Sequence, residues 1–150
     1  MRYRFVDKIV NLEAGKKIHC QYTWPQSLEI FEDHFPGFPV VPGVLLTEMM
    51  GQCSALCIES ARTDLTAAML VQIKNATFRK WVSPGVPLDI HAEVLSEQAK
   101  LARVVVRTEV DGIVAANSEL LLTYEAKDKL GLPDVDPILA TYLAQFALES

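Results

Sequence analysis

The hydrophobic residues of the chain are arranged in two kinds of pattern, and the first is a single long apolar stretch. Between residues 44 and 58 most side chains are apolar, and a helical projection of this stretch shows no continuous polar face. A helix with this pattern is buried on most sides. The stretch is shorter than the roughly 18 apolar residues that a membrane-spanning helix needs. We therefore predict a buried helix within a globular domain.

The second pattern is typical of β-strands and occurs in residues 17–24, 88–94, 102–110 and 113–124. In the first two segments apolar and polar residues alternate, which places His19 and His91 on the polar faces. Asp111-Gly112 joins the last two segments and is a strong signal for a hairpin turn. One buried helix with several long strands predicts an α+β fold, in which a mostly antiparallel sheet wraps around the helix.

The last part of the chain has the pattern of an additional helix. Asp136-Pro137 suits the N-cap and first position of a helix. An apolar stripe at helical spacing follows, formed by Leu139, Tyr142, Leu143 and Phe146. A chain of 150 residues has the length of one domain. We predict a domain over residues 1–126 with a C-terminal helical extension over residues 127–150.

Composition and charge narrow the possible functions. Half of the residues are hydrophobic and the mean hydropathy is +0.18, which indicates a real core and additional apolar surface. The net charge of −5 disfavours general nucleic-acid binding. The N-terminus has no apolar signal region, and three cysteines at unpatterned positions indicate a reducing, cytoplasmic environment. The sequence has no metal-ligand spacing, phosphate loop or GxSxG motif, so no metal or other cofactor is expected.

The candidate chemistry lies around residues 34–43, whose sequence is HFPGFPVVPG. Prolines at positions 36, 39 and 42 stiffen this loop, and Pro42-Gly43 suits a turn into the buried helix. The loop presents His34, while Glu48 and Gln52 lie four residues apart on one face of the helix. An imidazole and a carboxylate form an acid–base pair. The alternative is that Glu48 is a solvated acid near a helix start.

This segment resembles the active-site segment of the bacterial 3-hydroxyacyl-[acyl-carrier-protein] dehydratases, which have the hot-dog fold. The family pattern is His-Phe-Pro-Gly-x-Pro-x-x-Pro-Gly, followed by an acid and then a glutamine at the spacings of His34, Glu48 and Gln52. Weaker matches are the segment 76–80 with the Pro-Gly turn at 84–85, and the hairpin at 110–115. The resemblance covers roughly residues 3–125.

The resemblance implies a hydro-lyase that removes water from (3R)-3-hydroxyacyl thioesters to give trans-2-enoyl thioesters, without a cofactor. It implies that His34 removes the α-proton and that Glu48 protonates or polarises the leaving hydroxyl group. It also implies that the N–H of Gly43 stabilises the developing oxyanion. Gln52 orients Glu48 or a water molecule, or only satisfies a hydrogen bond in the core. The family places the histidine and the acid of one site on two subunits, so a homodimer or larger homo-oligomer is expected.

The partner that the resemblance implies is an acidic acyl carrier protein, and neither nucleic acid nor membrane is expected. Arg79 and Lys80 are adjacent and are the candidate docking residues. Arg103 and Arg107 share a strand face, which is equally well explained as an ordinary solvated face.

Two departures from the family pattern leave the pathway open between fatty-acid synthesis and a specialised polyketide or aryl-polyene-type route. Trp81 stands where proline is frequent, and it reshapes an acyl tunnel or fills the core. The C-terminal helix packs on the body or on a neighbouring subunit, or acts as a lid over that tunnel. A hot-dog thioesterase and a non-catalytic acyl-carrier binding subunit are the alternative functions. The glutamate at position 48 disfavours an isomerising enzyme.

Overall fold

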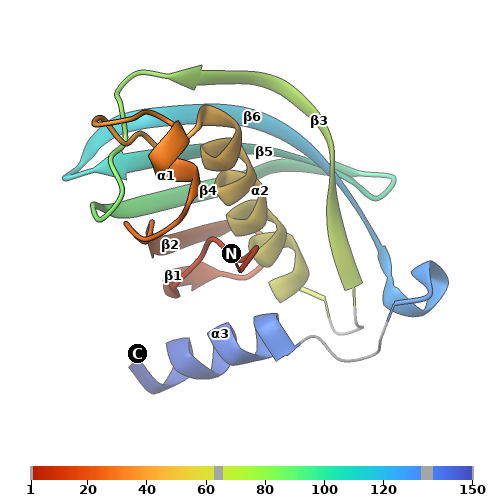
Figure 1. Cartoon of the computed structure of the whole chain (residues 1–150). Helices are drawn as coiled ribbons and strands as arrows, with labels where there is room; N and C mark the ends of the chain where they lie inside the picture. The colour runs from red at the N-terminus through yellow and green to blue at the C-terminus, as the bar shows by residue number, and fades with distance from the viewer. Residues whose placement is uncertain (1, 63–65, 133–136, 150) are drawn as a thin grey trace.

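The computed structural model describes residues 2–62, 66–132 and 137–149. Within them six strands form one sheet in the order β1-β2-β4-β5-β6-β3, and each neighbouring pair is antiparallel. The sheet curls around helix α2, as Figure 1 shows. The strands are β1 (Lys8–Glu13), β2 (Lys17–Thr23), β3 (Thr66–Phe78), β4 (Pro87–Gln98), β5 (Leu101–Val110) and β6 (Ile113–Ala126). The expected architecture of a sheet wrapped around a helix is confirmed.

Helix α2 (Gly43–Ser60) is the predicted apolar helix and forms the centre of the core. Pro42 is its N-cap residue, which confirms the predicted turn into the helix. Met49, Met50 and Cys53 are fully buried against the inner face of the sheet. The same alternation that predicted the strands places Ile18, Cys20 and Tyr22 of β2 on that inner face, with His19 outside. All three cysteines are buried and free, and a thiol in such surroundings packs as a small apolar side chain.

Strand β3 was not predicted over its full length, because its side chains show no alternation between a buried and an exposed face. It pairs with β6 on one side and is an edge of the sheet. Exposed apolar side chains occur on both of its faces, namely Met69, Leu70, Val71, Ile73 and Phe78. A long exposed edge strand of this kind is a surface for association with another chain.

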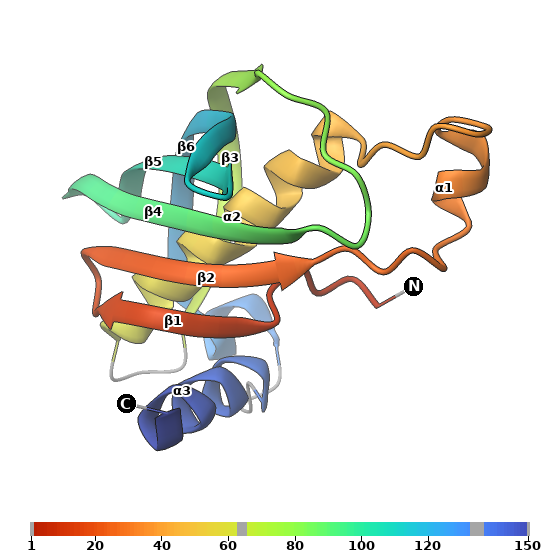
Figure 2. The ribbon, with the colours of Figure 1, turned by 90° about the vertical axis from the view of Figure 1, so that its left-hand side faces the viewer.

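A short helix, α1 (Ile30–Asp33), and the loop that follows it project from the body beyond the start of α2 (Figure 2). The sequence patterns did not predict this helix. It carries Phe31 into the core and leaves Glu32 and Asp33 exposed. The projecting segment contains His34 at the C-cap position of α1.

The C-terminal segment forms a 3₁₀ turn, η1 (Lys127–Leu130), and helix α3 (Pro137–Glu149). Helix α3 packs on β1 and on α2 of the same chain (Figures 1 and 2). Of the predicted apolar stripe, Tyr142 is buried, while Leu143 and Phe146 are partly buried and pack against the core. The side chain of Leu139 and the predicted cap at Asp136 lie outside the described residues. Within the described part of the chain, no helix is long and apolar enough to cross a membrane.

Candidate active site

The loop that carries His34 is held by backbone hydrogen bonds at both ends. The N–H of His34 donates to the carbonyl of Ile30 over 3.0 Å, and the carbonyl of His34 accepts from Val40 N–H over 2.9 Å. Val41 N–H then donates to the carbonyl of Val82 over 2.8 Å, which ties the loop to the body. The half-buried imidazole of His34 stacks on the ring of Phe35, with the centroids 4.0 Å apart. The loop therefore presents His34 in a defined position.

Gly43 is the first residue of α2 and is closely covered by an aromatic ring. A Cβ atom at this position would lie 3.0 Å from the ring of Phe78. Such a contact is tight, so glycine is the residue that fits here without moving the ring. The first N–H groups of a helix have no intrahelical partner and stabilise negative charge. The next residue of the helix, Val44, is 77% exposed.

Glu48 is held by its helical neighbour Gln52, one turn further along α2. Gln52 Nε2 donates to Glu48 Oε1 over 3.1 Å, and Gln52 Oε1 accepts from the backbone N–H of Phe5 over 2.7 Å. The amide of Gln52 thus contacts Glu48 and also satisfies a backbone donor, while its role in the reaction remains a prediction. Desolvation, and after it the negative charge of Glu48, raises the pKa of the neighbouring Tyr3.

His34 and Glu48 are on separate elements and are not joined within one chain. No hydrogen bond or ion pair among the residues that the structure describes connects the two side chains. His34 belongs to the projecting loop, whereas Glu48 lies on α2 inside the curled sheet. Their catalytic roles therefore remain predictions.

The predicted docking residues lie directly after the end of β3. The N–H groups of Arg79 and Lys80 both donate to the carbonyl of Ala115, over 2.7 and 3.2 Å. The side chain of Arg79 donates from Nε to Asn117 Oδ1 over 3.1 Å. Both basic residues are exposed, and Trp81 beside them is 75% exposed. The alternative in which Trp81 fills the core of this chain is therefore wrong.

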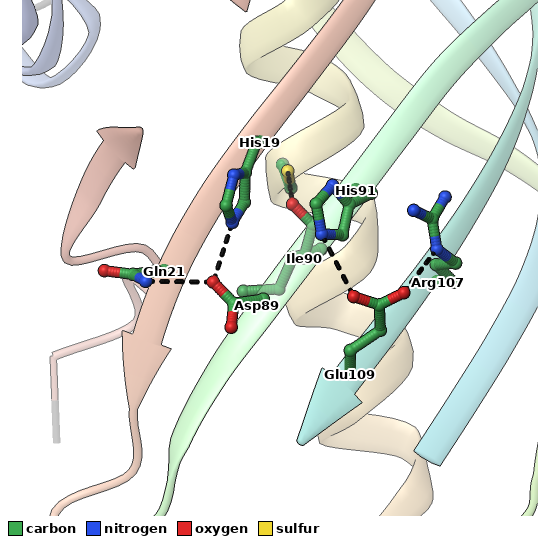
Figure 3. Close-up of polar contacts among 8 residues, drawn as sticks. His19, Gln21, Asp89, Ile90, His91, Arg107 and Glu109 are labelled. Atoms are coloured by element: carbon green, nitrogen blue, oxygen red, sulfur yellow. Dashed lines mark hydrogen bonds and ion pairs between the residues drawn. The ribbon is translucent and has the colours of Figure 1, made fainter. Parts of the chain in front are cut away.

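A second polar cluster, which the sequence did not predict, lies on the outer face of the sheet (Figure 3). The rings of His19 and His91 stack with centroids 4.1 Å apart. His19 Nε2 is 2.7 Å from Asp89 Oδ1, His91 Nε2 is 3.2 Å from Glu109 Oε2, and Arg107 Nε donates to Glu109 Oε1 over 2.8 Å. Only the register of β2, β4 and β5 brings these residues together. A hollow of about 770 Å³ adjoins His19, His91 and Arg107.

These residues are paired with one another rather than gathered around one point. Among the described residues, no group of three or more histidine, cysteine, aspartate or glutamate side chains is arranged to hold a metal ion. Burial, followed by the positive charge of His19 and Arg107, lowers the pKa of His91. The cluster is a cross-strand network of paired side chains, and such pairs contribute to the stability of a sheet.

A smaller cavity of about 180 Å³ lies between α2, the N-terminal segment and α3. Its lining is largely apolar and includes Val6, Leu56 and Tyr142, and it reaches Gln52. The C-terminal helix thus covers a space that extends to the neighbour of Glu48.

Comparison with known proteins places this fold and motif in one family. A family model described as ApeI-like, ApeI dehydratase, matches residues 11–117. The 3-hydroxyacyl-[acyl-carrier-protein] dehydratase FabZ of Geotalea uraniireducens is 35% identical over 130 residues, which cover 85% of this chain and 90% of the relative. The enzyme of the same name from Levilactobacillus brevis is 34% identical over 125 residues, covering 83% of this chain and 84% of the relative. The chain belongs to this family of dehydratases, and the expected enzyme class is confirmed.

Similar solved structures confirm the hot-dog fold. The dehydratase heterocomplex ApeI:P from Xenorhabdus doucetiae contains a chain with a TM-score of 0.59 and 20% identity, covering 77% of this chain and 96% of that chain. A structure described as a putative thioesterase from Ralstonia eutropha has a TM-score of 0.62 and 17% identity, covering 77% and 82%. At these identities the likeness concerns the fold alone.

Proposed function

We propose that this protein converts (3R)-3-hydroxyacyl thioesters on acyl carrier protein to trans-2-enoyl thioesters, in fatty-acid or related polyketide or aryl-polyene-type biosynthesis. The observation that carries the proposal is the hydrogen bond from Gln52 to the carboxyl group of Glu48. Both residues lie on α2, which begins at Gly43. The relatives that cover most of this chain are named for the same substrate class.

Three groups supply the chemistry. The imidazole of His34 takes the α-proton, and the electron pair of that C–H bond moves toward the thioester carbonyl. The N–H of Gly43 at the helix start stabilises the oxyanion, a contribution of roughly 3 kcal/mol for one donor in comparable sites. Glu48 protonates the 3-hydroxyl group, the C–O bond breaks, and water leaves as the double bond forms between the α- and β-carbons.

We further propose that the working unit is a homodimer in which His34 of one subunit meets Glu48 of the other. In one chain the two residues are not joined, and the surface around them is strongly apolar. Phe35, Phe38, Val44 and Trp81 are all exposed there, and β3 is an apolar edge strand of the sheet that the described residues form. A two-fold interface would bury these side chains and bring together two equivalent sites.

Mixing two inactive variants tests the shared site. His34→Ala and Glu48→Gln are each inactive on their own in this account. In a mixture that has exchanged subunits, half of the dimers contain one of each, and each such dimer has one intact site. About a quarter of the wild-type activity should therefore return. A site formed within one chain would show no recovery, since every site would lack one residue. Wild-type turnover in the same assay tests the reaction itself.

A further inference from the structure

A continuous series of contacts runs from the C-terminal helix to Glu48. The hydroxyl group of Tyr142 on α3 donates to the carbonyl of Val6. The neighbouring residue, Phe5, donates its backbone N–H to Gln52 Oε1 over 2.7 Å. Gln52 Nε2 then donates to Glu48 Oε1 over 3.1 Å. The N-terminal segment at residues 5–6 is therefore held by α3 on one side and holds Gln52 on the other.

The direction of these hydrogen bonds fixes the orientation of the Gln52 amide. A backbone N–H can only donate, so the atom of Gln52 that faces Phe5 must be the carbonyl oxygen. The amide nitrogen is thereby turned toward Glu48 and occupies one of its two oxygens. In the proposed function, the other oxygen of Glu48 is the one that meets the hydroxyl group of the substrate.

Residues 5–6 also belong to the core, where both side chains are buried. The ring of Phe5 is fully buried and packs on Trp24, with the centroids 4.6 Å apart. Between Tyr142, Val6 and Gln52 lies the cavity of about 180 Å³, so side-chain packing does not fill this region. Burial raises the pKa of Tyr142 to about 12, so its hydroxyl group keeps its proton at neutral pH.

We propose that Tyr142 is a positioning residue for the dehydration, acting on Glu48 through residues 5–6 and Gln52. The proposal rests on the proposed function, in which Glu48 protonates the leaving hydroxyl group. Tyr142 does not contact the thioester in the proposed reaction, so its effect is on the rate of the chemical step. The C-terminal helix α3 then has a role in catalysis, because its packing on β1 and α2 positions Tyr142.

Tyr142→Phe removes the hydroxyl group and keeps the buried ring. We expect kcat for dehydration to fall by roughly three- to tenfold, the usual effect of one lost hydrogen bond, with KM changed less than about twofold. The matched control is Tyr124→Phe, whose hydroxyl group is 3.5 Å from Glu97 and remote from Gln52. This control should keep the wild-type kcat.

A double-mutant cycle separates positioning from a general structural effect. Gln52→Leu should lower kcat at least as much as Tyr142→Phe, and in the Gln52→Leu background the tyrosine change should cost less than about 1.5-fold. An unchanged kcat in Tyr142→Phe, or an equal loss in both backgrounds, would overturn the proposal. If Tyr142→Phe does not fold, a wild-type kcat in Gln52→Leu would overturn it as well. An inactive wild-type protein would instead refute the proposed function.

Discussion

Gln52 Nε2 donates a hydrogen bond to Glu48 Oε1 over 3.1 Å, from one turn further along the central helix. The carbonyl oxygen of the same amide accepts a hydrogen bond from the backbone N–H of Phe5, so the backbone determines the orientation of the amide. A carboxyl group that was only a solvated acid near a helix start would need no such support. The arrangement supports the interpretation of Glu48 as a positioned acid.

His34 and Glu48 should each be essential for dehydration and dispensable for folding. His34→Ala and Glu48→Gln are expected to reduce kcat by about 10²- to 10⁴-fold, the range typical of positioned acids and bases. Turnover of a 3-hydroxyacyl thioester measures this effect, with circular dichroism and light scattering as checks of fold and assembly. Glu32→Gln is a matched control, because Glu32 is an exposed acid on the same projecting segment. A variant with a near-wild-type rate would show that the role of that residue is wrong.

Two glycines of α2 should respond in opposite ways to alanine. Gly43→Ala places a methyl group 3.0 Å from the half-exposed ring of Phe78, so the ring must move away from the helix start, and we expect kcat to fall. Gly51→Ala meets no atom within 4 Å and should be neutral or stabilise the helix by up to about 1 kcal/mol. Denaturant unfolding and kcat of both variants provide the comparison. Equal behaviour of the two would contradict the close packing at Gly43.

The docking role of Arg79 and Lys80 predicts an effect that depends on the carrier. Reversing both charges, with Arg79→Glu and Lys80→Glu, should raise KM for a substrate on acyl carrier protein by about tenfold or more, because the carrier is acidic. The same acyl group on coenzyme A should be affected much less. Lys16→Glu is a control in the turn between β1 and β2, where Lys16 pairs with Glu13. An equal effect on both substrates would contradict a docking role.

The pKa of His91 gives the stability a defined pH dependence. Burial, and then the charges of His19 and Arg107, lower this pKa from its ordinary value of 6.5, while Glu109 and Asp89 act in the opposite direction. The unfolded chain then binds the proton more tightly than the folded chain. The contribution to stability is complete above pH 6.5 and is lost as the pH falls through the folded-state pKa.

Removal of the imidazole should therefore reduce this pH dependence. Between about pH 7.5 and about pH 5.5, the free energy of unfolding should fall less in His91→Gln than in the wild type. Denaturant unfolding at both pH values measures the difference. Identical pH slopes for the two proteins would show that His91 does not titrate differently on folding.

Much of the fold could be predicted because its elements have a buried side. The helix at 44–58 has no continuous polar face, which indicates burial on most sides. The strands at 17–24 and 88–94 alternate, which indicates one buried face. Strand β3 has no such pattern, because it is an edge with exposed apolar residues on both faces. In the single chain both of its faces are exposed along most of its length, so no alternation marks a buried side.

The site was predictable only where the residues are close in sequence. The spacing of Glu48 and Gln52 indicates one helix face, and the structure shows their hydrogen bond. Phe5 is 47 residues from Gln52, and Tyr142 is 136 residues from Val6. These contacts join the two ends of the chain through the tertiary structure, and no periodicity in the sequence reports them.

The central claim is that the protein removes water from a 3-hydroxyacyl thioester, and one assay tests it most directly. The purified protein is incubated with 3-hydroxyacyl thioesters of several chain lengths, on acyl carrier protein and on coenzyme A. Mass spectrometry follows the enoyl product, and a thiol reagent follows hydrolysis. The account predicts loss of water without release of thiol. Release of thiol without the enoyl product would contradict it and identify a thioesterase.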